Sequence, residues 1–255
     1  MLFEIKDKKK ADIFSSIFQN LKGLTDKINM NIELDHMYIQ GMDNSHICIF
    51  DLTLKKEWFD IWEVEGSEIF GLNLIIFNKL LNTKTENQSI KIYNETQDKL
   101  EVTFKSDEKG DYNKYFQIPL MDLEIDLLQI PDIDYDVDIH MEIKKFKDTV
   151  DQLQMFNDVL DISCNNEDIV LLSEGIEGTM KVVINMDDIE EYSIVENEET
   201  RMSFALRYIS TMCQFHKVSK HVKIHISKNL PIQLKYELEH DSMLKLYLAP
   251  KISDD

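Results

Sequence analysis

The sequence predicts an α+β fold in which one structural unit of about half the chain is used twice. Two observations carry this prediction. Segments with apolar residues at every third or fourth position, typical of amphipathic helices, occur between segments of alternating apolar and polar residues, typical of half-buried strands. The order of these segments in the first half of the chain recurs in the second half at an offset of about 132 residues.

In the first half, the helical periodicity is clearest over residues 10–24, where Phe14, Phe18 and Leu21 belong to one apolar stripe. A second, shorter helix fits residues 73–81, with Asn73 as its N-cap. Alternating apolar and polar residues, separated by short polar breaks, predict strands at residues 28–34, 37–40, 46–54, 58–64, 89–93 and 100–105. The first half therefore combines two helices with several short strands.

The second half repeats this pattern and predicts helices near residues 142–156 and 204–213. The matched apolar pairs are Phe14/Phe146, Phe18/Val150, Leu21/Leu153, Leu24/Phe156, Leu72/Phe204, Leu74/Leu206, Ile90/Val222, Ile92/Ile224, Leu100/Ile232, Val102/Leu234 and Phe104/Tyr236. Alternating strands match one another under any even shift, so a few of these pairs are expected by chance. The repeated order of helix and strand is better explained by duplication.

Between the two copies lies a segment rich in proline and carboxylates, residues 119–138. Proline rigidity and repulsion between the acids favour an extended chain over a helix here. The predicted organisation is an N-terminal domain over residues 1–118, a connector over 119–138 and a C-terminal domain over 139–255. The connector's apolar side chains either lie on the surface, where they need a partner, or pack onto the core; they are Leu128, Ile130, Pro131 and Tyr135.

The chain is strongly acidic. Its 255 residues include 28 Lys and Arg against 48 Asp and Glu, which gives a formal net charge of −20. Such a charge opposes contact with nucleic acid unless the basic residues gather on one surface. With 43% hydrophobic residues the chain can bury a core, which excludes compositional disorder.

Cysteine usage and the N-terminus lead us to expect an intracellular protein without membrane association. The three cysteines, Cys48, Cys164 and Cys213, form no CxxC pair and are typical of a reducing compartment. The first residues turn charged at once and contain no apolar stretch of signal-peptide length. The most apolar window, residues 71–81, is far shorter than the roughly 20 residues that a bilayer needs.

Several stretches, in order and spread over the whole chain, resemble one family. They are MDNSHICIFDLTL (42–54), GLNL (71–74), PLMDLEIDLLQIP (119–131), SFALRYIS (203–210) and LYLAPKI (246–252). As a set, they resemble the sliding clamps of the proliferating cell nuclear antigen (PCNA) type. The resemblance implies duplicated clamp domains in a trimeric ring, with helices lining the inside and antiparallel sheets outside. It places the interface strands near residues 111–118 and 179–184.

The resemblance also implies a function. A DNA polymerase sliding clamp is a homotrimeric processivity factor that encircles duplex DNA without base readout and tethers replication and repair enzymes. Its clients would carry short glutamine-aromatic motifs, and a clamp loader ATPase would open the ring. The expected location is the nucleus or a viral replication compartment. Two alternatives stay open: a subunit of a heterotrimeric checkpoint-type clamp, and a monomeric clamp-fold factor that binds DNA or scaffolds partners.

By this resemblance, the DNA-facing residues are basic side chains in the four helical regions. They are Lys8, Lys9, Lys10, Lys22, Lys79, Lys144, Lys145, Lys147, Arg207, Lys217 and Lys220. Taken singly, each is equally well explained as a solvated surface residue. Acidic or neutral residues stand at positions where the family usually carries basic ones, so the inner surface is expected to be less positive than is typical; they are Ser15, Ser16, Asp148, Asp151 and Gln214. Asn166 stands where many eukaryotic members carry a lysine that is modified.

The resemblance further implies an apolar groove for client peptides beside the connector. Its expected residues are Met42, His46, Ile47, Ile49, Leu128, Ile130, Pro131, Tyr135, Pro231, Tyr247, Ala249, Pro250 and Ile252. These side chains are apolar or amphipathic, as a groove for aliphatic and aromatic anchors requires. The alternative for each is an ordinary structural role, such as ending a strand.

Metal and enzymatic chemistry find little support in the sequence. A C-x2-H-x4-H-x3-H spacing superficially resembles a zinc site, but it lies where a helix end runs into a strand, which keeps the four residues apart; they are Cys213, His216, His221 and His225. Alternating connector acids are better explained as solvated than as Mg²⁺ ligands; they are Asp132, Asp134, Asp136 and Asp138. The sequence has no P-loop, nucleophile elbow or GxGxxG. We therefore expect a non-enzyme without metal or cofactor, and a metal-dependent nuclease is a remote alternative.

Overall fold

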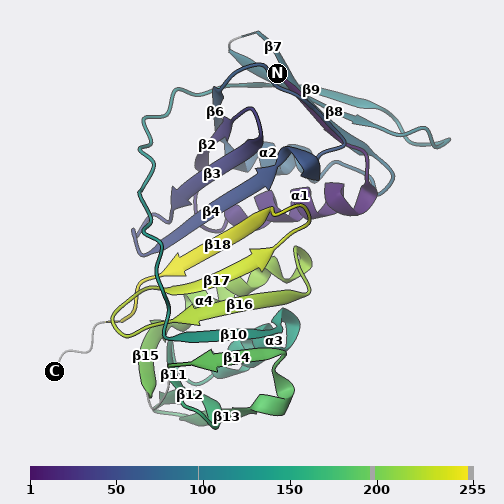
Figure 1. Ribbon diagram of the computed structural model, residues 1–255. Helices are drawn as coiled ribbons and strands as arrows, with labels where there is room; N and C mark the ends of the chain where they lie inside the picture. Colours follow the sequence, from purple (N-terminus) through teal and green to yellow (C-terminus); the bar gives the residue numbers. More distant parts are fainter. Residues whose placement is uncertain (97, 196–198, 252–255) are drawn as a thin grey trace. The chain divides into compact units, whose positions relative to one another are not determined.

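The computed structural model describes residues 1–96, 98–195 and 199–251. These residues divide into two compact units (Figure 1). Unit 1 contains residues 1–44, 51–128 and 238–244, and unit 2 contains residues 45–50, 129–237 and the C-terminal segment from Lys245. No helix in the described part of the chain has the length and apolarity needed to cross a membrane.

The first half of the chain begins with a strand and ends with a strand, with two α-helices between them. Its elements are β1 (Leu2–Ile5), α1 (Lys8–Leu21), β2 (Lys27–Ile32), β3 (His36–Met42), β4 (Cys48–Lys55), η1 (Lys56–Trp58), β5 (Ile61–Glu63), β6 (Glu68–Asn73), α2 (Leu74–Leu81), β7 (Ser89–Thr96), β8 (Lys99–Lys105) and β9 (Lys114–Pro119).

The second half runs through the same succession of elements. They are β10 (Val137–Glu142), α3 (Ile143–Leu153), β11 (Val159–Cys164), β12 (Asp168–Gly175), β13 (Gly178–Asn185), η2 (Met186–Asp188), β14 (Glu191–Ile194), β15 (Thr200–Ala205), α4 (Leu206–Cys213), η3 (Gln214–Lys217), β16 (His221–Ile226), β17 (Ile232–Glu237) and β18 (Met243–Leu248). Only η3, which extends α4, has no counterpart in the described first half.

Strand pairing repeats as well. Counting only neighbours within the same half, the strands of the first half lie in the orders β5-β1-β7-β8-β9 and β4-β3-β2-β6, and those of the second half in the orders β14-β10-β16-β17-β18 and β13-β12-β11-β15. Within its own half, each strand of the first half therefore has an equivalent with equivalent neighbours, and the pairs with a described register are antiparallel. The predicted duplication of one α+β unit is confirmed.

The helices form because their apolar stripes face the sheets and each other. In unit 1, Phe14 and Phe18 of α1 are fully buried, and the ring of Phe18 lies 4.9 Å from that of Phe77 in α2. In unit 2, Phe146 and Val150 of α3 are buried in the same way. Burying each such side chain contributes on the order of 1.5–3 kcal/mol. The polar faces of the helices are left to solvent.

The helix starts follow local capping chemistry. Asp7 accepts a hydrogen bond from the backbone N–H of Lys10 at 2.8 Å, so α1 begins at Lys8, two residues before the predicted start. Asn73 caps α2 as predicted, accepting from the N–H of Ile76 at 3.1 Å. At the other end, α1 stops at Leu21 because the following residues tighten into a turn.

One predicted strand is much shorter in the structure. The segment predicted as a strand at residues 58–64 begins inside the 3₁₀ turn η1, and only Ile61–Glu63 pairs as β5. Trp58, which alternation had placed on that strand, is instead buried against Phe14 of α1 at a ring distance of 6.4 Å. Burial of a large ring thus determines the backbone here more strongly than the alternating pattern does.

Candidate functional site

The basic residues of the helical regions lie mostly on exposed positions. Exposed members are Lys8, Lys9, Lys22, Lys79, Lys144, Lys145, Arg207, Lys217 and Lys220, and half-buried members are Lys10 and Lys147. They belong to α1 and its C-cap, α2, α3, α4, η3 and the turn before β16. Since the opposite faces of these helices are buried, the basic side chains share the solvent side of each helix.

Three of these cations are held by acids. Lys8 Nζ lies 3.1 Å from Glu108 Oε1, and Lys10 Nζ lies 3.5 Å from Glu239 Oε2. Such exposed pairs are worth little in stability, on the order of 0–1 kcal/mol, but each offsets a positive charge.

The third pair lies on α3. Lys147 Nζ contacts Asp151 Oδ2 at 2.5 Å, one helical turn along, and this hydrogen bond raises the pKa of Lys147. Asp151 is one of the positions where the sequence departs from the expected basic pattern. Its carboxylate therefore offsets the charge of a lysine expected to face DNA.

Arg207 at the start of α4 lies over an aromatic ring. Its guanidinium carbon is 4.7 Å from the ring centroid of Tyr208, and Nη2 lies 3.3 Å from the Tyr208 hydroxyl oxygen. This contact orients the side chain without removing its charge. Arg207 is thereby a preorganised cation on the surface of unit 2.

The connector is fixed to unit 1 through backbone groups. Gln40 of β3 binds both backbone groups of Leu128, accepting from its N–H at 2.6 Å and donating to its carbonyl at 3.0 Å. Asn29 of β2 donates to the carbonyl of Leu123 at 3.1 Å, and the N–H of Met121 donates to the carbonyl of Gly71 at 2.8 Å. The buried side-chain amides of Gln40 and Asn29 thus bind connector backbone groups that a neighbouring strand would otherwise bind.

Because its backbone is held this way, the connector presents apolar side chains to solvent. Leu128 is 42% exposed, and Leu127 and Ile125 are exposed as well. Pro131 is exposed and Ile130 is half-buried. The sequence-based expectation that these side chains lie at the surface fits the positions of Leu128 and Pro131.

Other groove candidates in unit 2 come together at the C-terminal segment. The N–H of Ala249 donates to the carbonyl of Ile47 at 3.0 Å, which places these two segments side by side. His46 lies at the turn before β4 with a φ of 59°, and Tyr247 is nearly buried in β18. Half-buried members of the set are Met42 in unit 1 and Ile49, Pro231, Ala249 and Pro250 in unit 2. Ile252 lies outside the described residues.

Tyr135, also expected in the groove, packs inward against unit 2. Its ring lies 5.4 Å from that of His225, and burial raises the pKa of its hydroxyl to about 12. Its hydroxyl oxygen is buried without a hydrogen-bond partner among the described residues. The Tyr135 side chain is therefore half-buried and packed at the end of the connector, so it does not form an open site for a client's anchor residue.

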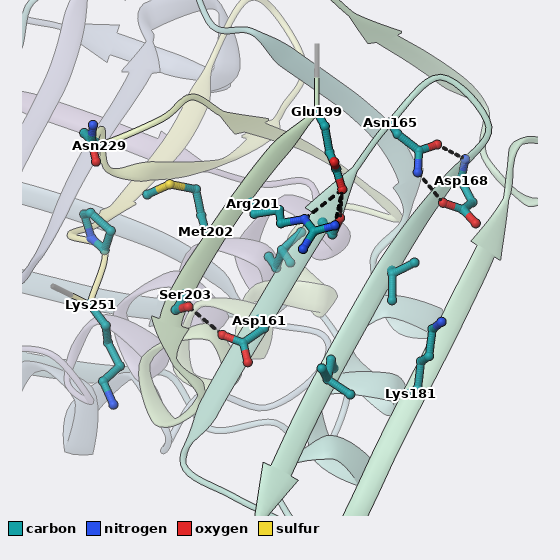
Figure 2. A pocket seen from close by; sticks show the side chains of 15 residues that line it. Asp161, Asn165, Asp168, Lys181, Glu199, Arg201, Met202, Ser203, Asn229 and Lys251 are labelled. Atoms are coloured by element: carbon teal, nitrogen blue, oxygen red, sulfur yellow. Dashed lines mark hydrogen bonds and ion pairs between the residues drawn. The ribbon is translucent and has the colours of Figure 1, made fainter. Parts of the chain in front are cut away.

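Unit 2 also has a cavity of about 1050 Å³ on the outward face of its four-stranded sheet (Figure 2). Several of its polar groups pair with one another: Arg201 pairs with Glu199 at 2.7 Å, Ser203 donates to Asp161, and Asn165 donates to Asp168 at 2.8 Å. Of the predicted groove residues, Pro250 lines this cavity. This cavity could not be predicted from the sequence, because polar residues on an outward strand face carry no distinguishing pattern.

The zinc-like spacing does not converge in the structure. Cys213 ends α4, His216 lies in η3, and His221 and His225 lie four residues apart on β16. The free cysteines are buried, and burial raises the pKa of the Cys213 thiol. The expectation of a helix end running into a strand is confirmed.

Comparison with known proteins decides the family. Residues 2–128 match the family profile "Proliferating cell nuclear antigen, N-terminal domain", and residues 129–251 match "Proliferating cell nuclear antigen, C-terminal domain". The chain belongs to the proliferating cell nuclear antigen family. The two matches meet within the segment between β9 and β10, so each covers one copy of the duplicated fold.

Individual relatives agree over nearly the whole chain. The proliferating cell nuclear antigen of Chaetomium thermophilum is 28% identical over 252 residues, covering 96% of this chain and 97% of the relative. That of Caenorhabditis elegans is 28% identical over 252 residues, covering 96% and 95%. Proliferating cell nuclear antigen 2 of Drosophila melanogaster is 26% identical over 243 residues, covering 95% of each.

A solved structure shares the fold. A chain of the PCNA2–PCNA3 complex from Sulfolobus tokodaii superposes with a TM-score of 0.87 at 22% identity, covering 98% of this chain and 99% of that chain. The duplicated clamp fold implied by the sequence is confirmed. The chain is a DNA sliding clamp, a DNA-binding processivity factor of replication from a family of non-enzymatic, oligomer-forming clamps that bind DNA and polymerases.

Proposed function

We propose that this clamp is a homotrimer that closes head to tail into a ring around duplex DNA and tethers client enzymes there. The observation that carries the proposal is a pair of free sheet edges. β9 ends the five-stranded sheet of the first half, and β13 ends the four-stranded sheet of the second half. Because the two edges belong to different copies of the fold, their pairing between chains is heterologous, and such contacts form a ring when the rotation from chain to chain closes.

The two edges suit one another chemically. Each strand carries an exposed apolar side chain: Tyr115 on β9 is 66% exposed, and Val183 on β13 is 46% exposed. An exposed edge with such residues is a template for another strand, and pairing between chains would remove it from solvent. We assign the interface to residues 111–118 of one chain and 179–184 of the next.

DNA contact would fall to the exposed basic residues of the helical regions. An encircling protein needs only weak contact with phosphates, so a net charge of −20 is compatible with binding inside a ring. The acidic surface elsewhere would discourage other nucleic-acid contacts. We infer no catalytic activity for the chain itself, and retention on DNA would be topological.

Client enzymes would bind beside the connector, residues 119–138, which joins domains at 1–118 and 139–255. We propose that Leu128, Ile130 and Pro131 offer one apolar wall and that His46, Ile47 and the Ala249-Pro250 segment offer the other. Short client motifs with a glutamine and aliphatic and aromatic anchors would fill it. A clamp loader ATPase would open the ring, and the eukaryotic relatives favour the nucleus as its location.

Light scattering on the eluting protein tests the assembly. The wild-type chain should give three times the 30.1 kDa mass of one chain over a concentration series. Val183→Asp should shift this mass toward one chain, because it buries a charge at the proposed strand pairing. Leu34→Asp is the matched control, because Leu34 is 60% exposed between β2 and β3 and belongs to neither edge strand.

A mixed ring with different neighbouring chains is the second candidate. It is favoured by acids that offset basic helix residues, such as Asp151 beside Lys147. In that case the purified chain would elute as a monomer or dimer at all concentrations, and Val183→Asp would leave its mass unchanged.

A further inference from the structure

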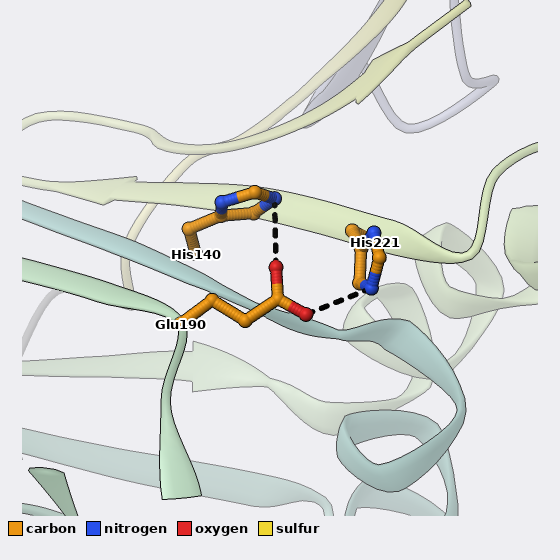
Figure 3. A group of neighbouring side chains, drawn as sticks. All are labelled: His140, Glu190 and His221. Atoms are coloured by element: carbon orange, nitrogen blue, oxygen red, sulfur yellow. Dashed lines mark ion pairs between the residues drawn. The ribbon is translucent and has the colours of Figure 1, made fainter. Parts of the chain in front are cut away.

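Outside the clamp's binding surfaces, one cluster of side chains in unit 2 has the composition of a metal site. His140 of β10, His221 of β16 and Glu190 just before β14 bring three ligand atoms within 4.8 Å of one another. The carboxylate of Glu190 lies between the two imidazoles (Figure 3). Its Oε1 is 2.8 Å from His221 Nε2, and its Oε2 is 3.5 Å from His140 Nε2.

Strand register explains why these residues meet. β10 and β16 pair so that Glu142 faces His221 and Lys223 faces His140. His140 and His221 are therefore diagonal neighbours on one face of the sheet, a separation that imidazole side chains can bridge. Their rings are 5.5 Å apart at the centroids. Glu190, the third residue, lies at the β14 edge of the sheet, and its backbone N–H donates to the carbonyl of His140 at 2.9 Å.

The charges around the cluster favour a cation. Glu191, on the register position beside His140, places Oε2 3.9 Å from His140 Nδ1, and Glu142 faces His221. Lys223 is the basic residue paired with His140, and its Nζ is bound to Glu237 Oε1 at 3.0 Å. The carboxylates therefore outweigh the nearest ammonium, whose charge is already offset.

We propose that His140, Glu190 and His221 form a binding site for a divalent zinc-class ion. Two imidazoles and one carboxylate are a recurrent zinc ligand set, with water completing the tetrahedron. Tetrahedral ligands at zinc lie roughly 3.4 Å apart, so the observed separations need only small side-chain rotations. The side chains are 24% exposed for His140, 33% for His221 and 45% for Glu190, which leaves both room to rotate and access from solvent.

A bound ion would join three strands of one sheet. β14 is the edge strand of this sheet, β10 pairs with β14, and β16 pairs with the other side of β10. Coordination would fasten Glu190 and the start of this edge to the two inner strands. The effect of the ion would therefore be structural, a reinforcement of the β14 edge that does not depend on ring closure or on DNA.

The test is a calorimetric titration of the tag-free, full-length chain with ZnCl₂ after removal of metals with a chelator. We expect saturable binding of one Zn²⁺ per chain and little response to MgCl₂, because imidazole nitrogens are poor ligands for Mg²⁺. Glu190→Gln and His221→Gln should each weaken the affinity for Zn²⁺ by more than about tenfold. In thermal unfolding, Zn²⁺ at a hundredfold excess over its Kd should raise the Tm of the wild-type chain by about 5 °C.

His225→Gln is the matched control. His225 lies on the same strand and face and pairs with Asp138, but among the described residues it belongs to no group of three metal-ligand side chains. This variant should bind Zn²⁺ like the wild-type chain. In chelator, all three variants should unfold at nearly the wild-type Tm, because the substituted side chains are partly exposed. Absence of saturable Zn²⁺ binding, or an affinity that Glu190→Gln leaves unchanged, would overturn the proposal and leave an ion-paired cluster.

Discussion

At the scale of single residues, the ion pair of Lys147 and Asp151 limits the positive charge that α3 would offer to DNA in the proposed ring. The two side chains are one turn apart, and the hydrogen bond between them raises the pKa of Lys147, so the lysine stays charged but compensated. Asp151 also accepts from Ser210 of α4 at 3.2 Å. Asp151 thus links α3 and α4 of unit 2, and its negative charge lowers the positive potential beside Lys147.

Removing this acid should strengthen DNA binding. In Asp151→Asn, Lys147 becomes available to a phosphate, so we expect higher affinity for duplex DNA at low salt. The slope of log K against log salt concentration should steepen by about one. Fluorescence anisotropy over a salt series measures both quantities.

Glu65→Gln is the control for that variant, because it changes the net charge equally at an exposed loop position between β5 and β6. It should leave the salt slope unchanged. An unchanged slope for Asp151→Asn as well would remove α3 from the proposed DNA-facing surface.

The buried thiols give a second prediction at this scale. Burial raises the pKa of Cys164 to about 12, above the value of about 8.5 for a free thiol. Between these values the unfolded chain loses a proton that the folded chain keeps, so stability should fall as pH rises from about 8.5 to about 12.

Because the three thiols are buried, native protein at pH 8 should resist a thiol-specific reagent that modifies Cys48, Cys164 and Cys213 in denaturant. Rapid modification of the native chain would contradict the described burial.

At the scale of elements, the connector and the C-terminal segment are equivalent parts of the duplicated fold. After β9, the N–H of Met121 donates to the carbonyl of Gly71 in β6. After β18, the N–H of Lys251 donates to the carbonyl of Ser203 at the matching place in β15. Each segment follows the last strand of its half, β9 or β18, and binds the equivalent strand, β6 or β15, so the two proposed walls of the client groove have a common structural origin.

Gly71 is the position where this arrangement is most sensitive. A Cβ atom added there would lie 2.1 Å from the carbonyl oxygen of Met121, which is backbone and cannot turn aside. Gly71→Ala should therefore displace the connector and destabilise the chain by about 1–3 kcal/mol in urea unfolding. It should also weaken binding of a client peptide with the glutamine-aromatic motif, while the mass of the assembly stays that of the wild type.

Gly66→Ala is the matched control, because a Cβ atom there would meet nothing within 4 Å. It should change neither stability nor peptide affinity by a measurable amount. Undiminished peptide affinity in a folded Gly71→Ala variant would mean that the connector takes no part in the client groove.

The helices and the duplication could be predicted because they depend on local and repeated signals. Phe14 and Phe18 recur as Phe146 and Val150 in the same order of elements. Asn73 could be predicted as the N-cap of α2 because its own side-chain oxygen accepts a hydrogen bond from the helix backbone. β1 was not predicted from its pattern, since four residues beside a run of lysines carry too little alternation. Its place is determined by pairing with β5 and β7, distant in sequence.

Site residues divide in the same way. Basic residues on helices are visible in sequence, but some acids that neutralise them, such as Glu108 beside Lys8, come from distant parts of the chain. The cluster of His140, Glu190 and His221 was invisible for the same reason, because strand register alone brings these residues together. The sequence instead drew attention to Cys213 and His225, which the fold keeps apart.

At the scale of the whole molecule, duplication and charge are related. Two copies of one fold per chain provide two different sheet edges, which allows identical chains to associate head to tail. A chain with a net charge of −20 gains little from binding DNA across an open surface. A closed ring needs only weak contact to stay on DNA, since release requires a free end or an opened interface. The acidic composition is thus consistent with a clamp that acts by encirclement.

Encirclement of DNA is tested by comparing DNA topologies. The purified clamp, at a concentration where light scattering gives the mass of three chains, is crosslinked to one DNA molecule as a closed circle, as a linear duplex and as a linear duplex with both ends blocked by bulky protein. A closed ring should crosslink to the linear DNA with free ends, onto which it can thread, and little to the circle or the blocked duplex. Equal crosslinking to all three would contradict encirclement and indicate a protein that binds DNA from one side.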